Sequence, residues 1–207
     1  PREAQVGFYG LDLYSLGASI TAVLEYLDHV DPAAAAVARR RYGCLTPLQI
    51  SPETYGRAML SAGYATCEDE VVRQCRELLE RRLEYAAADG ERYLDASQNA
   101  RLVASAERYY RAMYYGGAES WNLRDMHMFG TLRHLLEARG PQSKAVVWAH
   151  NSHIGDARQT EMGLARGELN IGQLCREAHG EQAALIGFGT HEGTVAAASD
   201  WGGKMGV

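Results

Sequence analysis

The chain has 207 residues, of which 46% are hydrophobic and 23% are charged, close to the values of ordinary globular proteins. Its formal net charge of −5 comes from 21 basic and 26 acidic residues without a basic block, which argues against binding to nucleic acid. The apolar runs fall far short of the roughly 20 residues needed to span a bilayer, so none is expected to cross a membrane.

The amino-terminal part predicts one strand followed by a helical region. Residues 6–13, VGFYGLDL, form a short apolar run that is typical of a buried strand and ends near Asp12. Residues 15–115 carry charges at helical spacing between Pro, Gly and Asp stops. Within this region, Asp31-Pro32 and Ser51-Pro52 each combine an N-cap acceptor with a proline at the first helical position, and therefore predict two helix starts.

Three longer helices are predicted further along the chain. One runs from about residue 66 to 89, because three acidic residues at its start favour the positive end of the helix dipole. A second covers residues 91–115 and ends at a Gly-Gly pair. A third covers residues 120–138 and ends in Arg-Gly-Pro, which is typical of a helix exit.

The remainder has an α/β pattern, with strands at residues 144–149 and 183–188 and a helix at residues 171–178. Strands that alternate with helices predict parallel neighbours in a layered sheet. We therefore expect an α/β fold with a largely parallel sheet flanked by helices. The predicted domains are an α/β body and a helical insertion, which comprise residues 1–14 with 116–207 and residues 15–115.

Each predicted strand ends in polar side chains. Asp12 ends the first, His150 and His153 follow the second, and a Thr-His-Glu segment ending at Glu192 follows the third. Because the carboxyl ends of parallel strands meet at one sheet edge, these groups are expected to share a cleft. Asn151 belongs to a run of four polar side chains after a buried strand, which predicts contact with a polar ligand. Asp12 has a second interpretation, as the cap of the following helix.

The two histidines allow several kinds of chemistry. HxxH pairs occur in zinc sites, but this pair follows a strand and lacks the Glu of HExxH, which argues against a metal site. The residues around Ser152 do not form a GxSxG elbow, so a serine nucleophile is not favoured. A histidine that carries protons or stabilises an oxyanion fits the pattern better. Arg124, next to Asp125 in the helix at residues 120–138, is predicted to hold an acidic substrate group.

The four cysteines are scattered without CxxC spacing: Cys44, Cys67, Cys75 and Cys175. This distribution argues against a structural zinc site and against a small disulfide framework, so we expect free thiols in a reducing, cytoplasmic compartment. The chain opens on Pro-Arg-Glu without an initiator methionine or a signal-like segment, and we interpret it as a piece of a longer protein.

Several segments resemble the erythromycin esterase family, which also contains proteins described as succinoglycan biosynthesis proteins. They are AHNSHIGDARQTEMG, RGELNIGQLCRE, ALIGFGTHEGTVAAASDW, GFYGLDLYSL and WNLRDMHM. The resemblance implies a metal-independent, cofactor-free hydrolase that opens a macrolactone with water activated by a histidine, as in macrolide antibiotic resistance. It also implies an α/β sheet body with a helical insertion.

The family motif assigns roles to particular residues. Its paired histidines fall on His150 and His153 as catalytic groups, and its cleft arginine falls on Arg124. Asp12, Asn151 and Glu192 are expected to bind the substrate. Family members are longer and carry a Glu and His motif in their amino-terminal part that supplies the water-activating base. The resemblance therefore implies that this chain corresponds to the carboxyl-terminal portion of such an enzyme.

Three hypotheses follow for the function. The first is a hydrolase whose partner is a small molecule, namely an ester, a lactone or an acyl sugar, with neither nucleic acid nor membrane involved. The second is a non-catalytic binding homologue that keeps the cleft. The third is a metal-dependent hydrolase that uses His150 and His153 together with Glu192.

Overall fold

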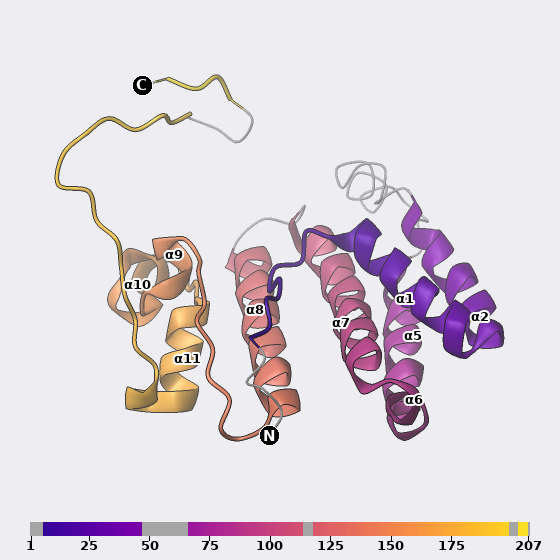
Figure 1. Cartoon of the computed structure of the whole chain (residues 1–207). Coiled ribbons are helices and arrows are strands. Elements are labelled where there is room, and N and C mark those ends of the chain that lie inside the picture. The colour runs from indigo at the N-terminus through magenta and orange to yellow at the C-terminus, as the bar shows by residue number, and fades with distance from the viewer. Residues whose placement is uncertain (1–5, 47–65, 114–117, 199–202, 207) are drawn as a thin grey trace.

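The structure, a computed structural model, describes residues 6–46, 66–113, 118–198 and 203–206, and helices dominate it (Figure 1). The α-helices are α1 (Leu16–Val30), α2 (Pro32–Tyr42), α5 (Glu68–Glu80), α6 (Arg82–Ala88), α7 (Gly90–Met113), α8 (Ala118–Arg139), α9 (Asn151–Ile154), α10 (Glu161–Arg166) and α11 (Ile171–His179). Three short 3-10 helices are η1 (Gly43–Leu45), η2 (Ala157–Gln159) and η3 (Gly180–Gln182).

Local signals in the sequence account for most of the helix boundaries. The carboxylate of Asp31 accepts the Ala34 N–H at 3.0 Å with Pro32 at the first helical position, which confirms the predicted start of α2. The acidic first turn of α5 is also confirmed, but the predicted helix divides at Arg81 into α5 and α6. Helices α7, α8 and α11 lie where helices were predicted. The start predicted at Ser51 lies outside the described residues.

The predicted α/β fold with a largely parallel sheet is wrong. No strand is present among the described residues, where the only β-pairing is an isolated bridge between Ala197 and Gly206. The three segments predicted as strands are extended, and most of their apolar side chains are exposed, such as Trp148 at 90%, although Leu13 is buried. A strand is stabilised by hydrogen bonds to a neighbouring strand, and an apolar run does not by itself provide that neighbour.

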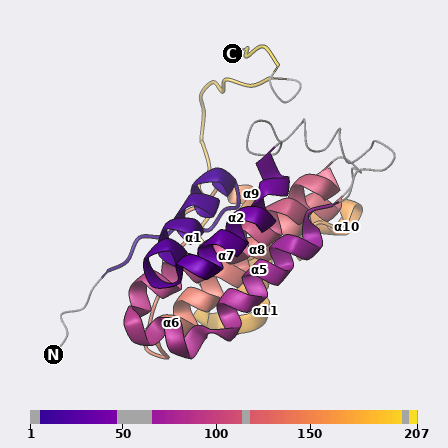
Figure 2. The same cartoon turned by 90° about the vertical axis from the view of Figure 1, so that its right-hand side faces the viewer.

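Two apolar clusters organise the helices. The larger one lies among α1, α2, α5, α6 and α7. The smaller one consists of Met128 and Leu132 on α8 and Ile171 on α11. Helix α8 packs against α7 on one side and α11 on the other, as Figure 1 shows, and Figure 2 shows the helices one behind another in the turned view. Helix α8 thus joins the bundle to the segment that carries the paired histidines.

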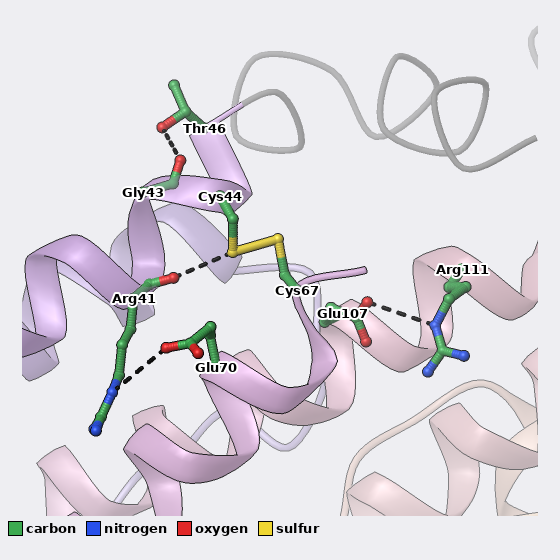
Figure 3. Close-up of a disulfide and its surroundings, with 8 residues drawn as sticks. All are labelled: Arg41, Gly43, Cys44, Thr46, Cys67, Glu70, Glu107 and Arg111. Carbon is green, nitrogen blue, oxygen red and sulfur yellow. Dashed lines mark hydrogen bonds and ion pairs between the residues drawn. A yellow bond between two sulfur atoms is a disulfide. The ribbon is translucent and has the colours of Figure 1, made fainter. Parts of the chain in front are cut away.

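The cysteines depart from the sequence prediction. Cys44 in η1 and Cys67 just before α5 form a disulfide, with their Cα atoms 5.9 Å apart (Figure 3). The expectation of free thiols is therefore wrong for this pair, whereas Cys75 and Cys175 are free. The two bonded cysteines are 23 residues apart, and the packing of α2 against α5 brings them together, which spacing in the sequence does not reveal.

No helix within the described ranges is long and apolar enough to cross a membrane. The described helices of residues 16–113 share the larger apolar cluster. The predicted domain boundary, with an insertion at residues 15–115, stays a prediction.

Candidate functional site

A buried carboxylate and an imidazole lie at the centre of the candidate site. Asp125 on α8 is fully buried, and His153 on α9 is 7% exposed. The Nδ1 atom of His153 lies 3.0 Å from each carboxylate oxygen of Asp125. A carboxylate accepts hydrogen bonds only, so Nδ1 carries the proton and donates it. This leaves Nε2 as the atom of a neutral His153 that can accept a proton.

Three further contacts hold this pair in place. The Ile171 N–H, at the start of α11, donates to Asp125 at 2.9 Å. The indole ring of Trp121 stacks on the His153 ring, with centroids 4.7 Å apart and planes 1° from parallel. Because Trp121 and Asp125 are four residues apart on α8, both project from the same helical face. The His153 ring is therefore fixed in position and in plane.

The first turns of α8 also hold the loop that precedes α11. The Trp121 indole N–H donates to the Leu169 carbonyl at 2.8 Å. The side-chain amide of Asn122 donates to the Gly167 carbonyl at 3.0 Å and accepts the Leu169 N–H at 2.9 Å. Asn170 caps α11 and donates to the Ser152 carbonyl at 2.9 Å. These bonds fasten α9, and with it His153, to α8.

An ion pair between Arg124 and Asp12 lies beside the Asp125–His153 pair. Arg124 donates from Nε and Nη2 to the two Asp12 oxygens, at 3.0 and 2.6 Å. Burial alone raises the pKa of Asp12, but hydrogen bonds from Arg124 and from the Leu13 N–H outweigh burial and hold that pKa below its usual value. A proton on His153 would lower the pKa of Asp12 further, so the two pairs are electrostatic neighbours.

His150 and Asn151 have local structural contacts. His150 precedes α9, and its Nδ1 accepts the Ser152 N–H at 3.2 Å and lies 2.9 Å from the Ser152 hydroxyl. The Asn151 amide contacts both backbone groups of Phe188: it donates to the carbonyl and accepts the N–H at 3.0 Å. Both side chains are exposed. The Asn151 amide thereby satisfies the two backbone groups of Phe188 that a neighbouring strand would otherwise bind.

Glu192 belongs to the extended segment that follows Phe188. It lies exposed on the extended segment that leads away from the helices, and no interaction within the described part of the chain joins it to Asp12, Arg124 or His153 (Figure 1). Across the described residues, no group of three or more His, Cys, Asp or Glu side chains is placed to hold a metal ion. The common rim predicted for Asp12, the paired histidines and Glu192 stays a prediction.

The sequence analysis missed Asp125 and Trp121 as site residues. Both lie in the WNLRD segment, in which only Arg124 had been assigned a role. Their spacing of four residues on a predicted helix, with an aromatic ring beside a carboxylate, is the signal that could have identified a shared binding face. What the spacing does not show is that His153 is the group bound there, since it is 28 residues away from Asp125.

A helical protein with a carboxylate–imidazole pair beside a guanidinium has the groups of a general acid–base site. The family model described as erythromycin esterase matches residues 1–207, and the chain belongs to the erythromycin esterase family. No solved structure gives a significant match. Family membership indicates a hydrolase-type function.

Proposed function

We propose that this protein is a carboxylic-ester hydrolase of the erythromycin esterase type that acts on an ester or lactone, with His153 as its proton carrier. The single observation that carries the proposal is the hydrogen bonding of His153 Nδ1 to the buried Asp125, at 3.0 Å to each oxygen. A buried carboxylate that holds one ring nitrogen fixes the tautomer and orientation of the imidazole, and stabilises the imidazolium when it forms.

The proposed reaction adds water to the acyl carbon. His153 Nε2 accepts one proton from water as the water oxygen bonds to that carbon, and a tetrahedral oxyanion forms. The oxyanion then collapses, the bond to the alcohol oxygen breaks, and His153 returns the proton to this leaving oxygen. An ester gives an acid and an alcohol; a lactone gives one hydroxy acid.

Arg124 is the proposed group for the oxyanion. Its Nε and Nη2 atoms are held by Asp12, while its Nη1 atom makes no hydrogen bond with any described residue. Hydrogen bonding to Asp12 raises the pKa of Arg124 in spite of burial, so the guanidinium keeps its charge. A preorganised donor of this kind stabilises charge that develops in the transition state.

The test is the substitution Asp125→Asn, which keeps the side-chain shape and removes the charge. We expect the kcat of the protein on its best substrate from a panel of erythromycin, simple lactones and nitrophenyl esters to fall by about 10²- to 10⁴-fold, because the imidazole loses its tautomer and its counter-charge. Asp95→Asn is the matched control: it makes the same chemical change at an exposed position on α7.

The outcomes separate the hypotheses. A large loss of kcat in Asp125→Asn, with normal kcat in Asp95→Asn, supports a catalytic role for the Asp125–His153 pair. Equal activity in both variants would remove Asp125 and His153 from the chemistry. Wild-type protein that binds members of the panel but hydrolyses none of them would favour the non-catalytic binding homologue.

A further inference from the structure

Two tyrosine hydroxyls lie directly beside the Arg124–Asp12 pair. Tyr14 is on the extended segment before α1, and Tyr109 is on α7. Their hydroxyl oxygens are 3.0 Å apart, and their rings meet edge to face with centroids 6.0 Å apart. The exposure of the two residues differs: Tyr109 is 8% exposed, whereas Tyr14 is 52% exposed. Tyr109 is thus buried, whereas about half of Tyr14 is open to solvent.

Burial decides the direction of this hydrogen bond. Burial raises the pKa of Tyr109, and the bond to Tyr14 raises it further, so Tyr109 keeps its proton. Within the described part of the chain, the Tyr109 hydroxyl has no hydrogen-bond partner other than Tyr14. A buried O–H without an acceptor costs free energy, so Tyr109 donates to the oxygen of Tyr14. The proton of Tyr14 is then free to be donated outside the pair.

Tyr14 is coupled to the candidate site through Arg124. The Cζ atom of Arg124 lies over the Tyr14 ring, 4.8 Å from its centroid. The same guanidinium is fixed by Asp12, so ring and cation keep a constant arrangement. A cation over the ring and a donated hydrogen bond at its oxygen both draw electron density from the phenol, and chains of hydrogen bonds strengthen one another. The Tyr14 O–H is therefore a strong donor.

We propose that Tyr14 contacts the substrate as a hydrogen-bond donor, and that Tyr109 positions it. The substrate group is an oxygen that gains negative charge, either the acyl oxygen or the leaving alcohol oxygen of the ester or lactone. No proton is transferred to the substrate from Tyr14 in this role. The inference rests on the proposed function and assigns the bundle helix α7 a part in it.

The test compares Tyr14→Phe, Tyr109→Phe and the double variant on a hydrolysed member of the ester and lactone panel. Tyr14→Phe keeps the ring beneath Arg124 and removes the donor, so kcat should fall by about 10²-fold with little change in KM. Tyr109→Phe should lower kcat by roughly fivefold, the value of one neutral hydrogen bond. The double variant should be no worse than Tyr14→Phe, because Tyr109 acts only through Tyr14.

Tyr9→Phe is the matched control, since Tyr9 lies on the same extended segment and its hydroxyl contacts Arg139 at the far end of α8. Unchanged kcat in Tyr14→Phe, with an active wild type, overturns the inference and leaves the proposed function intact. Independent, additive losses overturn the positioning role of Tyr109.

A second measurement does not depend on activity. The proton NMR signal of the Tyr109 hydroxyl should be visible in the wild type, because a buried, hydrogen-bonded proton exchanges slowly with water, and it should disappear in Tyr14→Phe. A signal unaffected by the substitution overturns the hydroxyl pair. A wild type that hydrolyses no ester overturns the proposed function, and with it the substrate contact of Tyr14.

Discussion

At the scale of single residues, the site depends on a few side chains that each have two partners. Asp125 receives both the His153 ring and the Ile171 N–H, so one carboxylate joins α8, α9 and α11. Trp121 stacks on His153 and donates to the Leu169 carbonyl. Removal of either hydrogen bond to Asp125 leaves a buried polar group unpaired, which typically costs about 1–3 kcal/mol.

Gly172 provides a residue-scale prediction, because α11 comes very close to the turn after His153. A Cβ added at Gly172 would lie 2.2 Å from the Gly155 carbonyl oxygen and 2.4 Å from that of Ile154. Both are backbone atoms that cannot rotate away. We expect Gly172→Ala to lower the free energy of unfolding by roughly 1–3 kcal/mol, as for other overpacked sites, when measured by urea denaturation.

Gly130→Ala is the control for that substitution. Gly130 lies within α8, and a Cβ there would meet nothing within 4 Å. This variant should gain about 0.5–1 kcal/mol from higher helix propensity. Identical effects of the two substitutions would contradict the close packing of α11 on the turn.

At the scale of elements, α8 is the helix on which the site is built. It packs against α7 and α11, and it carries Trp121, Asn122, Arg124 and Asp125 in its first half. A helix with neighbours on two sides buries polar as well as apolar faces, so its polar residues must find partners in the adjacent elements. The partners come from the extended segment before α1 and from the region of α9 and α11.

His127 on the same helix predicts a pH dependence of stability. Burial lowers its pKa to about 4, although the charge of Asp12 acts in the opposite direction. Its ordinary value is 6.5. Between these values the unfolded chain binds a proton that the folded protein does not, so stability falls as the pH falls from 6.5 towards 4, by up to about 3 kcal/mol.

His127→Asn should flatten the curve of unfolding free energy against pH in that window. His179→Asn, an exposed histidine at the end of α11, should leave the curve unchanged. Urea denaturation at several pH values from 4 to 7 measures both. A curve for His127→Asn with the wild-type slope would mean that His127 is not the group responsible.

At the scale of the whole molecule, α8 packs between α7 and α11 and carries most of the candidate site. Tyr109 lies on α7 and Arg124 on α8, and both contact Tyr14. The site therefore requires α7 and the α9–α11 region to be folded against α8 together. The cytoplasmic location expected from the sequence stays a prediction, and the disulfide bears on it because such bonds are rare in reducing compartments.

The disulfide between Cys44 and Cys67 predicts which cysteines can be alkylated. Alkylation of the denatured protein without a reductant should modify only Cys75 and Cys175, and all four cysteines after reduction. The double variant Cys44→Ser, Cys67→Ser should lose about 3 kcal/mol of unfolding free energy, the chain-entropy value for a loop of this length. Four reactive thiols in the unreduced protein would show that the bond does not form.

The sequence by itself determined the features that depend on neighbouring residues. The proline and Asp31 cap of α2, the acidic start of α5 and the exit of α8 are contacts within a single turn, so composition and spacing suffice to predict them. The choice of His153 and Arg124 as candidate residues likewise followed from local patterns.

Only the tertiary structure decided which distant groups meet. The apolar runs around Val146 and Phe188 have strand-forming composition, but strand formation depends on a hydrogen-bonding neighbour that composition does not specify. The pairing of Asp125 with His153, of Cys44 with Cys67 and of Tyr14 with Tyr109 depends on how the helices pack. Side-chain contacts across helices arise from shape and burial over the whole fold, which no local pattern encodes.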